Sequence, residues 1–178
     1  VLVKKTNLCL HHLNHRLRSI VLKMKTTIVI PTYNEAANIQ SLVYTIMKLR
    51  VDDLHVLIVD DNSPDGTGEL ADELHFDYPR RVQVLHRYEK PGLGFAYVDA
   101  LTQALHEGAD YIVQLDADFS HSPRYVPRFL KKISDYDVIV GSRYIAGGSV
   151  DERWSFGRYL LSWWANSCLL YTSDAADE

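Results

Sequence analysis

The stretch T-T-I-V-I-P-T-Y-N-E at positions 26–35 passes directly from a β-branched apolar run into a polar turn. The same transition recurs at positions 56–67, where V-L-I-V is followed by D-D-N-S-P-D-G-T. Short apolar runs of this kind are typical of parallel strands that are buried on both faces. Longer helical patterns alternate with these runs along the chain. Because strand–helix alternation with short loops builds a parallel sheet, the sequence predicts an α/β fold with an open, mostly parallel sheet and helices on both faces.

The chain between residues 26 and 141 continues this alternation. The expected strands are Thr26–Pro31, Val56–Val59, Val82–His86, Tyr111–Leu115 and Val138–Gly141. The expected helices are Glu35–Leu49, Thr67–Phe76, Gly94–Glu107 and Pro123–Ile133. We expect Asn34 to cap the first helix and Pro123 to begin the fourth, because these residue types favour those positions.

Length and composition limit the class of protein. A chain of 178 residues suits one domain, and 47% hydrophobic with 24% charged residues is typical of a globular protein. The longest apolar-rich stretch, Tyr159–Tyr171, is too short and too polar to span a membrane, which takes about 20 apolar residues. Cys9 and Cys168 form neither a disulfide framework nor a metal set. We therefore expect a soluble, intracellular chain.

The charge is unevenly distributed along the chain. Five basic residues and no acidic ones precede Met24, whereas the remainder carries 14 Lys and Arg against 23 Asp and Glu. An acidic body argues against nucleic acid as the main partner and suits a site for a divalent cation.

The two ends of the chain lack the strand–helix pattern of the segment between them. Residues 1–23 lack a strand or helix pattern and are expected to be a non-native or disordered extension, with a transit peptide as the alternative. Residues 170–178 are small, acidic and unpatterned, and are expected to be a non-native tail. The folded domain is thus assigned to residues 24–169, is expected to be incomplete at its carboxyl end, and should fold without residues 1–23.

Acidic residues follow several of the expected strands. Ligands bind beyond the carboxyl ends of the strands in open α/β sheets, so these residues mark a candidate site. Asp116 and Asp118 leave the fourth strand two residues apart, and such a pair can direct oxygens at one hard cation that also binds a diphosphate. An ordinary Asp-rich turn is the alternative for this pair alone.

Asp60 and Asp61 end the second strand and begin a stretch with turn-forming residues. Their carboxylates can recognise a base or a ribose by accepting hydrogen bonds, and the turn can form at the same time. Arg87, Lys90, Gly92 and Gly94 lie in a loop before a helix, where an anion would be favoured.

Two further arginines and one histidine are candidates near the same edge. Arg143 and Arg158 suit a second anion, because the planar guanidinium matches phosphate. His121 fits a structural hydrogen bond as well as a functional one. Neither a G-x-G-x-x-G nor a Walker A sequence is present, which disfavours dinucleotide and P-loop sites.

Five motifs in this order resemble those of a known family. They are P-T-Y-N-E at 31–35, V-D-D-N-S-P-D-G-T at 59–67, G-L-G-F-A-Y at 92–97, D-A-D-F-S-H at 116–121 and G-S-R-Y at 141–144. Together they resemble the family-2 glycosyltransferases with the GT-A (Rossmann-like) fold, and more closely the polyprenol (dolichol) monophosphomannose synthases. The resemblance covers about residues 25–168.

The resemblance implies GDP-mannose as donor, a polyprenyl (dolichyl) monophosphate as acceptor, and Mg²⁺ or Mn²⁺ as cofactor. It implies a peripheral location at the cytoplasmic face of a membrane, where the lipid acceptor lies. The implied nucleotide-binding residues are Pro31, Tyr33, Glu35, Val59, Asp60, Asp61 and Ala117. The implied metal ligands are Asp116, Asp118 and Ser120, the last standing where some members have Gln. Arg143 and Arg158 match arginines near the acceptor phosphate, while Trp163 stands where a basic residue is common.

The expected reaction follows from the acceptor. A phosphate monoester is anionic at neutral pH, so its attack on the sugar C1 needs no strong general base. Positioning and stabilisation of the leaving diphosphate are needed instead, with Asp116, Asp118 and Arg143 as the catalytic candidates. In-line attack gives an inverted, β-linked mannosyl phosphate. The alternatives are a family-2 transferase that uses a UDP-sugar and a nucleotide-sugar-binding fragment without turnover.

Overall fold

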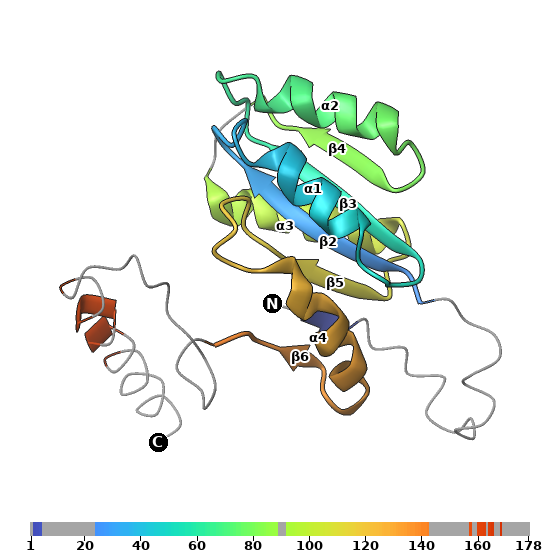
Figure 1. Cartoon of the computed structure of the whole chain (residues 1–178), viewed down its shortest axis with the longest axis vertical. Coiled ribbons are helices and arrows are strands. Elements are labelled where there is room, and N and C mark those ends of the chain that lie inside the picture. Colours follow the sequence, from blue (N-terminus) through green and yellow to red (C-terminus); the bar gives the residue numbers. More distant parts are fainter. Residues whose placement is uncertain are drawn as a thin grey trace. The chain divides into compact units, whose positions relative to one another are not determined.

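The computed structural model describes residues 2–4, 24–88 and 92–142, together with isolated helical positions between 157 and 168. The chain divides into two compact units, Val1–Val140 and Gly141–Glu178. The sheet and the helices that bear on function belong to the first unit (Figure 1). No helix among the described residues is long and apolar enough to cross a membrane.

The first unit is built on a six-stranded sheet with the order β4-β3-β2-β5-β1-β6. Its strands are β1 (Leu2–Lys4), β2 (Thr26–Thr32), β3 (Leu54–Asp60), β4 (Val82–His86), β5 (Tyr111–Gln114) and β6 (Val138–Ile139). Strands β2, β3, β4 and β5 run parallel, with Pro31 opposite Val59 and Val29 opposite Gln114. The polar segments after β2, β3 and β5 therefore meet at one edge, and the predicted mostly parallel sheet is confirmed.

Helices cover both faces of this sheet. They are α1 (Ile39–Met47), α2 (Thr67–Asp77), α3 (Leu93–His106) and α4 (Val126–Lys132), with short 3₁₀ turns at η1 (Pro123–Tyr125) and η2 (Ile133–Asp135). Figure 1 shows α1, α2 and α4 on one face and α3 on the other. The sequence analysis predicted helices on both faces of the sheet, and this is confirmed. Pro123 is the first residue of η1, which leads into α4, as predicted for the start of the fourth helix.

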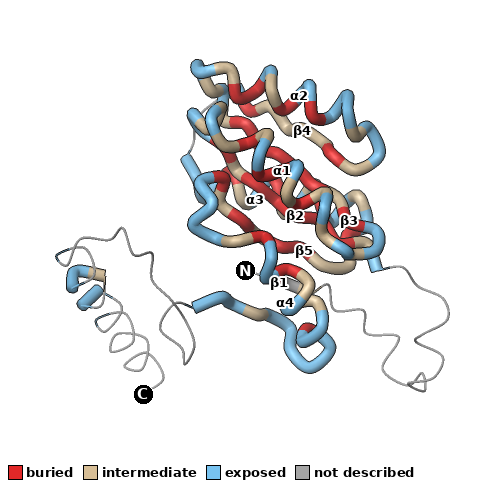
Figure 2. Tube along the Cα trace, in the orientation of Figure 1, coloured by how far each residue is buried: buried red, intermediate tan, exposed pale blue. Residues whose placement is uncertain are grey.

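The alternation of side chains along β2 explains why two hydrophobic cores form. Ile28 and Ile30 pack with α1, α2 and α4, whereas Val29 packs with α3. Helix α3 contributes Ala96, Ala100 and Ala104 to its core, and these small residues at a spacing of four allow the helix to lie close to the strands. Figure 2 shows the resulting band of buried residues along the central strands.

The predicted start of the first helix is wrong. Helix α1 begins at Ile39 with Asn38 as its N-cap, and Asn34 has a φ of 60°, which is left-handed rather than extended. The reason lies in the neighbouring loop, because the N–H groups of Asn34, Glu35 and Ala36 donate to side chains that follow β3. These donors are satisfied outside a helix, so the helix begins later.

The expectation of no strand before Met24 is also wrong for Leu2–Lys4. Strand β1 pairs antiparallel with both β5 and β6, and Leu2 is fully buried in the larger core. Strand β6 joins the sheet through β1, and Val138 is half exposed rather than buried as predicted. Residues 5–23 and the proposed tail at 170–178 lie outside the described residues, so their assignment as non-native stays a prediction.

Candidate active site

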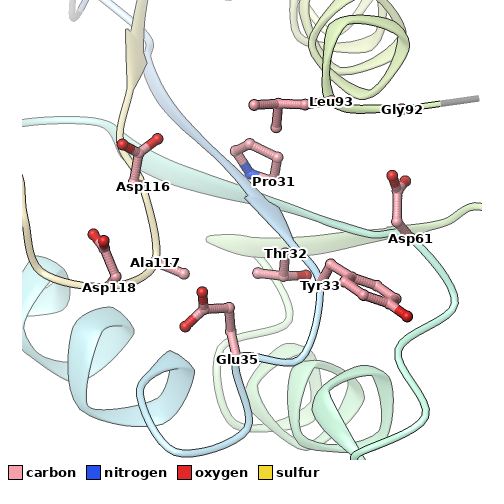
Figure 3. A pocket seen from close by; sticks show the side chains of 10 residues that line it. All are labelled: Pro31, Thr32, Tyr33, Glu35, Asp61, Gly92, Leu93, Asp116, Ala117 and Asp118. Carbon is pink, nitrogen blue, oxygen red and sulfur yellow. The ribbon is translucent and has the colours of Figure 1, made fainter.

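A cavity of about 450 Å³ opens at the carboxyl ends of β2, β3 and β5, as the parallel topology predicts. Figure 3 shows Asp116 and Asp118 on one side of it and Asp61 with Tyr33 on the other. The lining residues are Pro31, Thr32, Tyr33, Glu35, Asp61, Gly92, Leu93, Asp116, Ala117 and Asp118. Eight of the predicted site residues are among them, namely Pro31, Tyr33, Glu35, Asp61, Gly92, Asp116, Ala117 and Asp118.

Asp116 is held by hydrogen-bonding groups on both of its carboxylate oxygens. The Tyr97 hydroxyl of α3 donates to Oδ1 at 3.2 Å, and Nδ1 of His121 lies 3.2 Å from Oδ2. Burial and the neighbouring Asp116 carboxylate raise the pKa of Tyr97 to about 12. Tyr97 therefore keeps its proton at neutral pH and acts as a donor. His121 takes part in this arrangement as a partner of Asp116, and a functional role for it stays a prediction.

Asp118 lies in a tight turn that directs its carboxylate toward the cavity. Phe119 adopts a φ of 60°, a conformation that bulky residues rarely take and that requires support from its surroundings. The Ser120 N–H donates to Asp118 Oδ1 at 2.8 Å. Although desolvation raises the pKa of Asp118, hydrogen bonds from Ser120 and the nearby His121 outweigh it and hold the pKa below the ordinary value of 3.8. Asp118 is therefore ionised at neutral pH.

Asp61 lies across the cavity and is paired with a buried arginine. The Arg87 guanidinium contacts Asp61 Oδ1 through Nη1, and its Nε lies 2.9 Å from Oδ2 of Asp99 on α3. The Arg87 side chain is 7% exposed and that of Asp61 is 13% exposed, so water screens this pair little. Arg87 was expected to bind an anion from the ligand, but its charge is already matched by two carboxylates of the protein.

Asp60 and Val59 do not line the cavity, although both were predicted to bind nucleotide. Val59 is fully buried in the core beneath α3. The Asp60 carboxylate accepts from Ser63 Oγ at 2.6 Å, from the Ser63 N–H at 3.1 Å and from Thr32 Oγ1 at 3.3 Å. Asp60 thus holds the turn, while Asp61 faces the cavity. The two interpretations of this stretch, as a turn and as ligand-facing acids, both apply, one to each residue.

The turn after β3 also supports the loop after β2. The hydroxyl of Thr67 donates to Asp65 Oδ1 at 2.6 Å and accepts from the Glu35 N–H at 2.9 Å. Asp65 Oδ2 accepts from the Ala36 N–H at 3.1 Å. Glu35 in turn accepts from Asn38 Nδ2 at 2.9 Å. These contacts fix the loop that carries two of the cavity-lining residues, Tyr33 and Glu35.

Several predicted residues lie elsewhere. Ser120 is exposed and does not line the cavity. Arg143, Arg158, Lys90 and Trp163 lie outside the described residues. Their proposed roles therefore stay predictions.

Sequence reasoning missed Tyr97, Asp99 and Leu93, all of which come from α3. Tyr97 ends the motif G-L-G-F-A-Y, but nothing in the sequence indicates that its hydroxyl meets Asp116. Asp99 follows two residues later, and its pairing with Arg87 depends on how α3 crosses the sheet. Only the position of Leu93 could have been found, since it begins a helix at the cavity edge.

The carboxylates at this site suit a magnesium- or manganese-type cation. Among the described residues, no group of three or more His, Cys, Asp or Glu side chains is close enough to hold a metal by itself. Mg²⁺ commonly binds through one or two carboxylates and completes its shell with substrate phosphates and water. Asp116 and Asp118 provide such a pair of oxygen ligands beside a cavity. The residues present therefore fit a cation that binds together with a phosphorylated ligand.

Comparison with known proteins identifies close relatives. The chain is 43% identical over 144 residues to the polyprenol monophosphomannose synthase of Mycolicibacterium smegmatis, covering 80% of this chain and 54% of that protein. It is 44% identical over 142 residues to the undecaprenyl-phosphate mannosyltransferase of Micrococcus luteus, covering 79% of this chain and 56% of that protein. The chain thus spans just over half the length of these two relatives.

The fold has counterparts among solved structures. The crystal structure of residues 1–349 of S. aureus TarS superposes with a TM-score of 0.53 at 23% identity, covering 62% of this chain and 32% of the other. This likeness bears on the fold alone and agrees with the predicted GT-A fold. The sequence model described as glycosyl transferase family 2 matches residues 27–174, which is most of the chain. The chain belongs to glycosyl transferase family 2.

Proposed function

We propose that this domain transfers mannose from GDP-mannose to a polyprenyl (dolichyl) monophosphate and gives a β-linked polyprenyl mannosyl phosphate. The observation that carries the proposal is the division of one cavity between Asp61 and Tyr33 on one side and Asp116 and Asp118 on the other. A nucleotide diphosphate-sugar has a base at one end and a diphosphate at the other. The names of the two bacterial relatives, a polyprenol monophosphomannose synthase and an undecaprenyl-phosphate mannosyltransferase, support mannose as the transferred sugar and a polyprenyl phosphate as the acceptor.

The nucleoside would lie at the Asp61 end. Tyr33 is half exposed there and offers an aromatic face on which a base can stack, and Pro31 and Thr32 line the same cavity. Asp61 has one oxygen on Arg87, so its other oxygen can accept a hydrogen bond from the base or the ribose. This end of the cavity thus recognises a neutral group by hydrogen bonding and stacking.

The diphosphate would lie at the opposite end, beside Asp116 and Asp118. Two carboxylates do not bind a diphosphate directly, so Asp116 and Asp118 would bind it through a shared Mg²⁺ or Mn²⁺. When bound, such a cation neutralises the charge that develops on the leaving GDP. Asp116 and Asp118 would orient it, and the Tyr97 hydroxyl would keep Asp116 in place.

The acceptor phosphate would be positioned by Arg143 and Arg158. A polyprenyl monophosphate is already anionic, so the residues need to align it with the sugar C1 rather than remove a proton. An oxygen of the acceptor phosphate attacks C1 from the face opposite the leaving GDP. The new bond between C1 and this oxygen forms as the bond between C1 and the diphosphate oxygen breaks, which inverts the anomeric centre. The lipid tail of the acceptor would bring the protein to the cytoplasmic surface of a membrane as a peripheral protein.

Calorimetry with two donors tests the nucleotide and sugar assignment. GDP-mannose and UDP-glucose are each titrated into the chain with and without Mn²⁺. We expect Mn²⁺-dependent binding of GDP-mannose and at least tenfold weaker binding of UDP-glucose. Tight binding of UDP-glucose with no signal for GDP-mannose would instead favour a UDP-sugar transferase. Donor binding without mannosyl transfer to added polyprenyl phosphate would support the binding-fragment alternative.

A further inference from the structure

We infer that Tyr97 is a positioning residue for Asp116, and that it sets the affinity of the site for a divalent cation. The inference rests on the proposed function, in which Asp116 is a cation ligand. Tyr97 itself does not line the cavity, so it would act on the cation only through Asp116. The contact that carries the inference is the 3.2 Å hydrogen bond from the Tyr97 hydroxyl to Asp116 Oδ1.

The position of the Tyr97 ring is determined by its helix. Tyr97 follows Ala96, which is buried in the core between α3 and the sheet, and the ring packs partly buried against that same core. A ring held in this way has little rotational freedom to lose when its hydroxyl binds Asp116. By contrast, the His121 side chain on the other oxygen is 51% exposed. Tyr97 is therefore the more firmly placed of the two partners of Asp116.

The chemistry of the contact suits a group that orients a metal ligand. An ionised carboxylate can accept about four hydrogen bonds, so one donor on Oδ1 leaves sites on both oxygens for a cation. A tyrosine hydroxyl can donate to this oxygen and brings no competing negative charge. Partners that hydrogen-bond to ligating carboxylates commonly raise metal affinity by 10- to 100-fold.

The test compares Mn²⁺ affinity in the presence of GDP among the unmodified chain and two variants. Tyr97→Phe removes the hydroxyl and keeps the ring in the core. Tyr78→Phe is the matched control, because Tyr78 is also partly buried but packs with the core on the other face of the sheet. We expect Tyr97→Phe to weaken Mn²⁺ binding by about 10- to 100-fold and Tyr78→Phe to leave it within twofold of the unmodified chain.

The melting temperature in the absence of Mn²⁺ separates positioning from a general structural role. Tyr97→Phe and Tyr78→Phe are expected to shift it by similar small amounts, while Mn²⁺ affinity changes in one variant alone. Equal Mn²⁺ affinity of Tyr97→Phe and the unmodified chain would overturn the inference and leave the proposed function standing. An unmodified chain that binds GDP without any dependence on Mn²⁺ would overturn the metal part of the proposed function and the inference with it.

Discussion

Asp61 and Asp118 both bring a carboxylate to the cavity, and among the described residues Asp61 pairs with a buried arginine whereas Asp118 has the exposed His121 nearby. The buried guanidinium of Arg87 neutralises Asp61, and Asp99 shares that guanidinium. The Asp118 carboxylate accepts from a backbone N–H and remains exposed. At the residue scale, therefore, the carboxylate at one end of the cavity has a buried guanidinium beside it, and Asp118 at the other end is an exposed carboxylate that suits a cation.

Asp118→Asn is expected to abolish Mn²⁺-dependent binding of GDP-mannose and to leave the fold intact. The amide retains the shape of the side chain but loses the charge that attracts a cation, and an exposed substitution usually changes stability by less than about 0.5 kcal/mol. Calorimetry and thermal unfolding measure the two effects separately. Asp135→Asn, which changes an exposed carboxylate outside the cavity, serves as the control. Unchanged metal dependence in Asp118→Asn would remove Asp118 from the site.

Single residues also show what the sequence could and could not predict about the site. Asp116 and Asp118 follow a strand, and all parallel strands end at one edge, so their place in the cavity follows from the local pattern. Asp60 and Asp61 have the same local pattern, yet one holds the turn and the other faces the cavity. This difference arises from Ser63, Thr32 and Arg87, and the sequence does not state which of these contacts form.

At the scale of elements, the loops after β2 and β3 behave as one unit. Asp65 accepts a hydrogen bond from Thr67 within the segment after β3 and another from the N–H of Ala36 after β2, and the second bond links the two loops. The Thr67 hydroxyl, aided by backbone N–H groups, lowers the pKa of Asp65 below its ordinary value of 3.8 against an opposing effect of desolvation. Ionised Asp65 therefore stabilises the folded loops.

The pH dependence of stability tests this link. A carboxyl whose pKa is lower in the folded state stabilises fully above its unfolded pKa, and this stability is lost as the pH falls through the folded pKa. We expect Asp65→Asn to lower the free energy of unfolding at pH 7 and to bring it closer to that of the unmodified chain at a pH well below the ordinary value of 3.8. Urea titrations at both pH values measure the difference. A difference that stays constant with pH would mean that the Asp65 charge has no part in the link.

The elements that were predicted correctly depend on local pattern, and those that were missed depend on distant contacts. Helix α2 and strand β4 have a clear periodicity and were found almost to the residue. The start of α1 was misplaced because side chains from another loop satisfy the N–H groups there. Strand β1 has only three residues, too few for a pattern, and its stability comes from its two neighbouring strands.

The domain was expected to fold equally well without residues 1–23. Because Leu2 is buried in the core, we now expect their removal to lower its stability. Burying a leucine side chain contributes about 1.5–3 kcal/mol, and a loss of that size lowers the melting temperature of a domain of this length by several degrees. Donor binding should persist, because β1 does not line the cavity. Thermal unfolding and GDP-mannose titration of the deletion variant and of Leu2→Asp measure both effects. A melting temperature unchanged in both variants would show that β1 contributes nothing to the stability of the sheet.

For the whole molecule, we expect the donor and the acceptor to depend on different parts of the chain. The cavity-lining residues all precede Arg124, whereas the arginines proposed for the acceptor phosphate, Arg143 and Arg158, come later. In a full-length protein that carries this domain, Arg143→Ala should weaken polyprenyl phosphate binding and leave GDP-mannose affinity nearly unchanged. Loss of a charge-assisted contact to phosphate costs roughly 1.5–3 kcal/mol, or about one to two decades in affinity.

Separate titrations of donor and acceptor measure this division, with Arg80→Ala as an exposed control that lies outside the cavity. Equal weakening of both ligands by Arg143→Ala would place Arg143 on the diphosphate and contradict its assignment to the acceptor.

The short strand β1 has a practical consequence. It fills the position between β5 and β6 with three residues, and a ladder of backbone hydrogen bonds does not require that its strands be covalently continuous. In a chain without its first residues, that position would be open to a short extended peptide added in trans. Such a peptide, with an apolar side chain in the place of Leu2 and a fluorophore at its end, would report on the assembly of the sheet without touching the cavity. The domain could then serve as a two-part reporter whose recognition element is a single strand.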